Sequence, residues 1–290
     1  MRLLDRIHEC NIWSQADFIP FEIGSQRVGW LRRSELHRLD PWREVFDFTP
    51  QAVTLSPDLA DCTSRTAALE DVARGLYEGG AFSHWRDEPY PVLALPEEPS
   101  EIPDFLAEPL ALIERSAVRF FGLHAWGIHL NGFTRKSDGL HIWLQRRGMD
   151  RPLHPGLLDN LVAGGQPAGI PVADNLLKEA MEEAGLGAQI MAKAQARGTL
   201  SYCVDTFEGL SPATMILYDI ELDGQTIPRP VDGEVAEFLL WPVEKVVAAM
   251  ESGSEVKPNT HLAMIDFLLR HNLLETDDTG VIALRKALGR

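Results

Sequence analysis

The chain has 290 residues, 45% of them hydrophobic, and a formal net charge of −16. This length allows one large or two ordinary globular domains, and no apolar run of about 18 residues could span a membrane. The acidic balance argues against a nucleic-acid partner, because phosphate backbones bind basic surfaces. Cys10, Cys62 and Cys203 are scattered without a CxxC pair, and the charged amino end does not resemble a signal peptide. These features predict reduced thiols in a cytoplasmic protein.

The first hundred residues contain several expected elements but no catalytic pattern. Apolar residues recur at helical spacing over 65–80 and end at a glycine pair, which predicts a helix with a glycine cap. Residues 91–103 are rich in proline and acidic residues, as in a linker. A further helix is expected over 102–117, where it would lead into a second domain.

From residue 118 onward the pattern changes to that of strands. Residues 120–131 and 140–145 alternate and are rich in aromatic or β-branched residues, and the turn residues at 136–139 predict a hairpin between them. Helices interleaved among hairpins indicate a mixed sheet packed between helices, and therefore the α/β class. The other expected elements are strands at 159–163, 198–207, 213–222 and 238–242, and helices at 243–252 and 260–271.

Three glutamates form the most informative cluster in the chain. Glu179, Glu182 and Glu183 stand at positions i, i+3 and i+4, so a helix places their carboxylates on one face. Like charges at this spacing destabilise a helix unless they are neutralised, and carboxylate oxygens suit a hard divalent ion such as Mg²⁺ or Mn²⁺. Taken alone, the helix fits an ordinary solvated one that Gly185 caps better than it fits a metal site.

The spacing to a preceding glycine pair favours the metal-binding interpretation. Lys178 follows the first glycine of the pair Gly164 and Gly165 by 14 residues. With the segment 178–186 (KEAMEEAGL), this spacing resembles the Nudix box, a loop–helix signature of hydrolases that cleave nucleoside diphosphates linked to other groups. Lys178 replaces the family's arginine, and Ile170 stands where the family has a mainly structural glutamate. The change at Ile170 bears on loop geometry more than on metal binding, and the sequence leaves its effect on activity open.

Short segments outside the box look like one Nudix subgroup, related to the domain fused to thiamine pyrophosphokinase in some fungi. One of them looks like the end of the poorly characterised domain that precedes the Nudix domain in that subgroup. The segments are 85–92 (WRDEPYPV), 158–160 (LDN), 232–235 (DGEV), 257–259 (KPN) and 265–271 (IDFLLRH).

The resemblance implies an architecture as well as an activity. It predicts a Nudix α/β/α sandwich with a mixed sheet, preceded by a smaller α+β N-terminal domain. The expected boundaries are 1–115 for the N-terminal domain, 116–275 for the Nudix domain and 276–290 for a C-terminal tail. The N-terminal domain would serve substrate selection or dimer formation, and the sequence leaves open whether a homodimer forms.

The resemblance also implies roles for the residues of the box. Glu179 and Glu183 are expected to bind the metal most directly, Glu182 to act as a ligand or base, and the backbone carbonyl of Ala163 to add a ligand. Lys178 would orient a glutamate through an ion pair, although a lysine cannot form the two-pronged contact of an arginine.

Four residues outside the glutamate helix complete the expected site. Gly164 and Gly165 would let the backbone approach the helix and the substrate closely, or simply form a turn. Glu234 would be a further ligand or general base, as in many Nudix enzymes, or else an exposed acid of a turn. Lys257 would contact a substrate phosphate, or be an ordinary loop lysine.

The expected function is metal-dependent hydrolysis of a small diphosphate compound to a monophosphate, with Mg²⁺ as the cofactor or Mn²⁺ in its place. The subgroup implies thiamine diphosphate or a damaged form of it as substrate. Two alternatives stay open. One is a nucleoside-diphosphate derivative, such as a nucleotide sugar or dinucleotide, and the other is a ligand-binding or regulatory protein that keeps the Nudix fold with little turnover.

Overall fold

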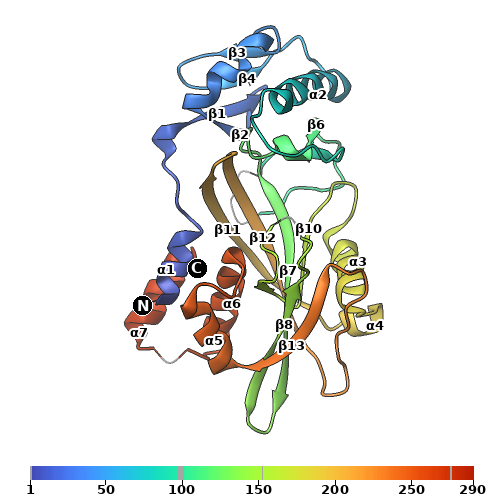
Figure 1. Cartoon of the computed structure of the whole chain (residues 1–290), viewed down its shortest axis with the longest axis vertical. Helices are drawn as coiled ribbons and strands as arrows, with labels where there is room; N and C mark the ends of the chain where they lie inside the picture. Colours follow the sequence, from blue (N-terminus) through green and yellow to red (C-terminus); the bar gives the residue numbers. More distant parts are fainter. Residues whose placement is uncertain (1, 97–100, 152, 275) are drawn as a thin grey trace.

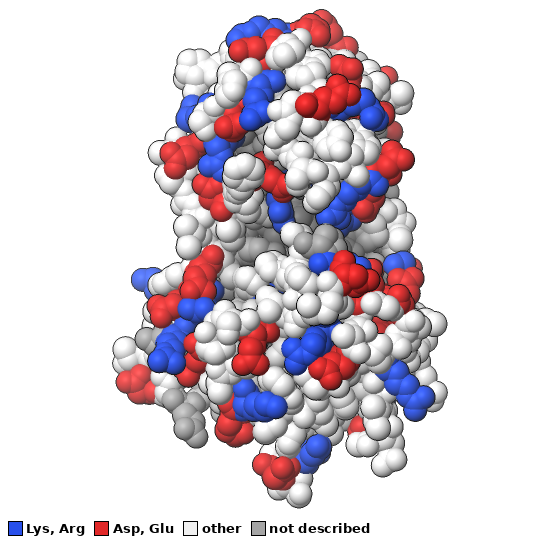
Figure 2. Space-filling view, viewed as in Figure 1, with Lys and Arg blue, Asp and Glu red and all other residues white. Residues whose placement is uncertain are grey.

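The computed structural model describes residues 2–96, 101–151, 153–274 and 276–290. The chain has an N-terminal part built on a four-stranded sheet and a larger part built on a seven-stranded sheet, and the two meet at a waist (Figures 1 and 2). Helices cover both faces of the larger sheet (Figure 1). This arrangement confirms the expected α/β class with a mixed sheet. On the face drawn in Figure 2, acidic and basic side chains are interspersed.

The N-terminal part has its own core, in which the rings of Phe21, Phe46 and Phe121 pack together. Its sheet has the strand order β2-β1-β4-β3, and the predicted helix at 65–80 is confirmed as α2. The side chain of Asp61 caps α2 by accepting a hydrogen bond from the backbone N–H of Ser64. The bounds are β1 Phe18–Ile23, β2 Gln26–Arg32, β3 Phe46–Phe48, β4 Val53–Leu55 and α2 Cys62–Glu78, with 3-10 turns η1 Gln15–Asp17 and η2 Arg33–Trp42.

The helix expected over 102–117 is wrong. Residues Ala111–Glu114 form strand β6, which pairs antiparallel with β5 (Pro89–Val92), and the 3-10 turn η3 (Arg115–Ala117) follows. Pro109 within the expected helix has no N–H to donate and disfavours a helical turn before it, so the segment extends and pairs instead. The linker expected over 91–103 falls partly on residues 97–100, which lie outside the described residues.

The seven-stranded sheet has the order β11-β12-β7-β8-β13, with β10 paired to β7 and β9 to β8. The β7–β8 hairpin confirms the predicted turn, since Lys136 pairs with Gly139. Strand β12 runs parallel to β7 and the other pairs are antiparallel, so the sheet is mixed. Its strands are β7 Ala125–Lys136, β8 Gly139–Arg147, β9 Leu158–Asp159, β10 Val162–Gly165, β11 Gln195–Thr206, β12 Gly209–Glu221 and β13 Val235–Pro242.

Alternation along the strands builds a separate apolar layer on each face of this sheet. On β8, Ile142 and Leu144 join the core under α6, whereas Trp143 joins the core under α3. The layer under α6 also contains side chains of α1, α5 and α7, and the layer under α3 extends to Met191 of α4. The helices are α1 Arg2–Glu9, α3 Val172–Ala184, α4 Ala188–Met191, α5 Val243–Ser252, α6 Pro258–Arg270 and α7 Asp278–Ala287.

Both ends of the chain pack against the larger sheet's helices. Leu3 and Ile7 of α1 share one core with Leu284 of α7, so the first helix lies with the last ones (Figure 1). Residues up to Leu123 contribute to the N-terminal core. The boundaries expected at 115 and 275 stay predictions. Among the described residues, no helix is both long and apolar enough to cross a membrane.

Candidate active site

Helix α3 presents the glutamate cluster because one of its faces is apolar. Leu176, Ala180 and Ala184 are buried at helical spacing, and Glu183 lies on the same side. Gly185 ends the helix in the left-handed conformation, with φ of 67°, which a glycine adopts without strain. The helix therefore buries one of the three glutamates, while its outer side faces solvent.

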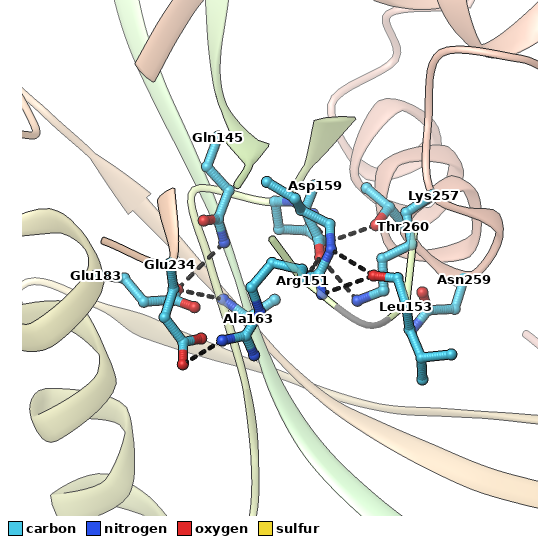
Figure 3. Close-up of polar contacts among 12 residues, drawn as sticks. Gln145, Arg151, Leu153, Asp159, Ala163, Glu183, Glu234, Lys257, Asn259 and Thr260 are labelled. Atoms are coloured by element: carbon cyan, nitrogen blue, oxygen red, sulfur yellow. Dashed lines mark hydrogen bonds and ion pairs between the residues drawn. The ribbon is translucent and has the colours of Figure 1, made fainter. Parts of the chain in front are cut away.

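Glu183 is the innermost carboxylate of the cluster, only 4% exposed. Its Oε2 accepts a hydrogen bond of 3.0 Å from the backbone N–H of Ala163 on β10 and one of 3.2 Å from Nε2 of Gln145 on β8 (Figure 3). Burial raises the pKa of Glu183 to about 8, and the negative charges of Asp159 and Glu179 act in the same direction. The Glu183 carboxylate therefore lies where its negative charge is unfavourable, and a bound cation would stabilise that charge.

Glu179 packs directly on the glycine pair. A Cβ atom at Gly164 would lie 2.5 Å from the carboxyl carbon of Glu179, far inside van der Waals contact. Burial also raises the pKa of Glu179, and the charge of Lys178 opposes this change. Gly164 is therefore needed for close approach, as the sequence predicts for this position.

Replacing Gly164 by alanine is expected to displace Glu179 and to reduce turnover strongly while the protein still folds. The physical reason is the 2.5 Å contact, which the Glu179 side chain can relieve only by moving away from β10. The matched control is Gly187→Ala, because a Cβ at Gly187 meets no atom within 4 Å. Turnover and thermal unfolding of the two variants check this expectation, and equal turnover in both would contradict it.

Lys178 bridges the two outer carboxylates. Its Nζ lies 2.7 Å from Oε2 of Glu182 and 3.3 Å from Oε1 of Glu179. The hydrogen bond to Glu182 is the main cause that raises the pKa of Lys178. Both Lys178 and Glu182 are 48% exposed, so Glu182 faces solvent and is held to the lysine rather than to β10.

Two amides that the sequence reading missed hold the loop between the glycines and the helix. Gln166 donates from Nε2 to the carbonyl of Ile170 at 2.8 Å, and Asn175 donates from Nδ2 to the carbonyl of Gly165 at 3.0 Å. Asn175 also donates to Oε1 of Gln166 at 3.1 Å. The loop is thus fixed by side chains other than residue 170, which fits an isoleucine at that position. In the sequence, Gln166 is marked only as a polar residue in a loop, and Asn175 only as a polar residue on a mainly apolar helix face.

Glu234 lies on the loop before β13, where it pairs with Arg151 (Figure 3). Its Oε1 is 2.5 Å from Nη1 of Arg151, and its negative charge contributes to the raised pKa of Glu179. Arg151, which the sequence reading also missed, has a buried Nε with no partner among the described residues. Glu234 thus brings a cation, Arg151, into the neighbourhood of the glutamate helix.

Lys257 lies in an ion pair instead of standing free for a substrate. Its Nζ donates to Oδ2 of Asp159 at 2.7 Å, and Asp159 also accepts from Thr260 and from the backbone N–H of Asn160. Although burial opposes it, the charge of Lys257 lowers the pKa of the fully buried Asp159 to about 2. The phosphate contact expected of Lys257 stays a prediction.

Comparisons with known proteins agree with this geometry. The chain is 33% identical over 295 residues to Nudix hydrolase 20, chloroplastic, of Arabidopsis thaliana, covering 98% of this chain and 76% of that protein. The chain belongs to the Nudix hydrolase family. It is therefore an enzyme that acts on phosphorus-containing anhydrides. Nudix hydrolase 24, chloroplastic, of the same plant is 34% identical over 289 residues, with 98% and 77% covered. The relatives' names leave the cytoplasmic location and the thiamine-related subgroup as predictions.

Two further comparisons concern parts of this Nudix hydrolase. Residues 2–125 match a family model described as a domain of unknown function, DUF4743. Among solved structures, the Nudix domain of NrtR from Shewanella oneidensis, complexed with ADP-ribose, is 15% identical with a TM-score of 0.41. That match covers 53% of this chain and 91% of the other.

Hydrolases of this family use divalent cations, and the donors at this site fit one. Glu179 and Glu183 lie beside β10, where the lack of a side chain at Gly164 admits Glu179, and every candidate donor is an oxygen, as hard cations prefer. Within the described part of the chain, no three His, Cys, Asp or Glu side chains are close enough together to hold a metal ion. Glu182 would have to leave Lys178 to join the other two.

Proposed function

We propose that this Nudix hydrolase cleaves the diphosphate linkage of a small ring-bearing compound, with thiamine diphosphate or a damaged form of it as the first candidate. The observation that carries the proposal is the pair of carboxylates, Glu179 and Glu183, held against the glycine pair and Ala163. Mg²⁺ is the proposed cofactor, with Mn²⁺ as the alternative, bound by Glu179, Glu182, Glu183 and the carbonyl of Ala163.

The bound cation would supply Lewis-acid neutralisation of the phosphoryl oxygens. The chain's own residues supply position and charge around it. Gln145 and the N–H of Ala163 hold Glu183 in one orientation, whereas Glu182 is bound to Lys178 and would have to leave it to reach the cation. Groups held in fixed orientations contribute to catalysis because they stabilise the negative charge that spreads over the phosphoryl oxygens in the transition state.

Glu234 and Arg151 form an ion pair near the cluster. We infer that Glu234 accepts a proton from the attacking water, while the positive charge of Arg151 favours the bound diphosphate. Gly164 lets Glu179 lie close to β10, and the diphosphate would approach the backbone at Gly165. Lys257 would reach a phosphate only by loosening its ion pair with Asp159.

The deciding experiment measures phosphate or monophosphate release from a panel of diphosphate compounds, with Mg²⁺ and with excess chelator. The panel contains thiamine diphosphate, its oxidised forms, a nucleotide sugar and a dinucleotide. We expect turnover of the thiamine class with Mg²⁺ and none with chelator. Turnover of the nucleotide compounds alone would show that the substrate is a nucleoside-diphosphate derivative and not a thiamine compound. Binding without turnover of any compound would instead identify a low-activity binding protein.

A further inference from the structure

A cavity of about 430 Å³ lies between the N-terminal part and the larger sheet. Its lining comes from five separated segments: residues 11–15 after α1, strand β2, Leu95, the residues just before β7, and the β11–β12 hairpin. Cavities of this size are typical of small-molecule sites. No residue of the glutamate cluster lines it, so the cavity is a separate recess from the one at the glutamates.

Two tryptophan side chains, Trp13 and Trp30, line this cavity. The rings of Trp13 and Trp30 are 5.7 Å apart and inclined by 60°, so they present two faces at an angle. The guanidinium carbon of Arg27 lies 4.9 Å from the centre of the Trp30 ring. None of the described residues that line the cavity is an aspartate or glutamate. Such walls favour a planar ring that stacks on aromatic faces.

Two of the polar side chains that line the cavity, His124 and Ser201, are joined through Thr214 by hydrogen bonds. Nε2 of His124 lies 2.8 Å from Oγ1 of Thr214, which in turn lies 2.8 Å from Oγ of Ser201. Burial, together with the charge of Arg27, lowers the pKa of His124 to about 4, so the imidazole is neutral at neutral pH. Its Nδ1 has no partner among the described residues, which leaves one ring nitrogen for a ligand's polar edge.

The cavity is close to the active site along β7. His124 directly precedes β7, and Gly127, three residues further on, pairs with Gly165. At the rise of a strand this separation is about 10 Å. The ring of His124 also contacts Trp126 at 4.7 Å, and Trp126 belongs to the core under α3. A ring-bearing diphosphate compound is long enough to bridge this separation.

We propose that this cavity binds the planar heteroaromatic group of the substrate, so that the diphosphate extends along β7 toward Gly165 and the glutamates. This inference rests on the proposed function for the identity of the ligand. It assigns the N-terminal part a direct role, since β2 and the α1–η1 connection supply both tryptophans. The ring is recognised by stacking and by the neutral imidazole, and the diphosphate by the Nudix box.

The test fills the cavity at one position and compares two sizes of side chain. Cys203→Phe places a ring in the cavity, whereas Cys203→Ala keeps a small side chain at the same position and leaves the space open. Binding of thiamine and of adenosine, both without phosphate, is measured by calorimetry on the full chain in the absence of metal. We expect one of them to bind the wild type and Cys203→Ala alike, and to bind Cys203→Phe about tenfold more weakly or worse.

Ser201→Phe, at a second residue that lines the cavity, repeats the test if Cys203→Phe does not fold. Equal affinity in the phenylalanine and alanine variants overturns the proposal, and so does the absence of binding of both compounds to the wild type. Failure of the proposed function has a different signature: a ring compound binds and is blocked by Cys203→Phe, yet no diphosphate is hydrolysed. That result supports the cavity as a ring-binding site and rejects only the proposed diphosphate substrate.

Discussion

Replacing Glu183 by glutamine is expected to reduce turnover by about two to three orders of magnitude, the loss typical when one electrostatic contact to a transition state is removed. The carboxylate is buried between Ala163 and Gln145, so no solvent-exposed group can take its place. Glutamine keeps the shape and can still accept the hydrogen bond from Ala163. Because a neutral amide is easier to bury than a carboxylate, the thermal stability should be unchanged or higher.

The matched control for this variant is Glu244→Gln, which removes an exposed carboxylate from the first turn of α5. Steady-state turnover and thermal unfolding are measured on both variants and on the wild type. A protein that only binds its ligand would show little change in either variant. Wild-type turnover in Glu183→Gln would thus remove Glu183 from the proposed mechanism.

Replacing Asp159 by asparagine is expected to lower the free energy of unfolding by about 3–5 kcal/mol, the usual cost of leaving one partner of a buried ion pair alone. Asp159 is fully buried and pairs with Lys257, with Arg147 at 3.5 Å as a second cation. Chemical denaturation measures the change. The double variant Asp159→Asn, Lys257→Met should recover part of the loss, because it removes the unpaired ammonium as well.

The stability that Asp159 contributes also depends on pH. Its pKa is lowered from 3.8 to about 2, so this contribution is fully present above pH 3.8 and is lost as the pH falls toward about 2. The asparagine variant should lack this part of the acid dependence. Glu221→Gln is the control, because the Glu221–Arg135 pair is 52% and 60% exposed and contributes at most about 1 kcal/mol. Equal losses in both variants would contradict the assignment.

The box was readable from the sequence because its geometry is local. Positions i, i+3 and i+4 share a helix face wherever the helix lies, so the neighbourhood of Glu179, Glu182 and Glu183 needs only that the helix forms. The turn of the β7–β8 hairpin is local in the same sense, and its prediction is confirmed. The helix wrongly expected over 102–117 shows the limit, because pairing with β5, from a distant segment, competes with local preference.

The partners of those residues were beyond the reach of sequence patterns. The packing of α3 on the sheet decides which glutamate is buried and which faces solvent, and it brings Gln145 to Glu183. The pairing of Arg151 with Glu234 likewise joins two separate loops. Lys257 illustrates the same point, since its partner Asp159 is 98 residues away in the chain.

The amino-acid sequence by itself determined the family resemblance, the α/β class and the set of box residues, since each rests on spacing within a few turns of helix or strand. The tertiary structure decided the buried state of Glu183, the ion pair of Lys257 and the aromatic cavity beside His124. These features arise where segments far apart in the chain meet. The burial of a side chain and its ion pairs depend on contacts between these segments, so the sequence of one segment cannot predict them.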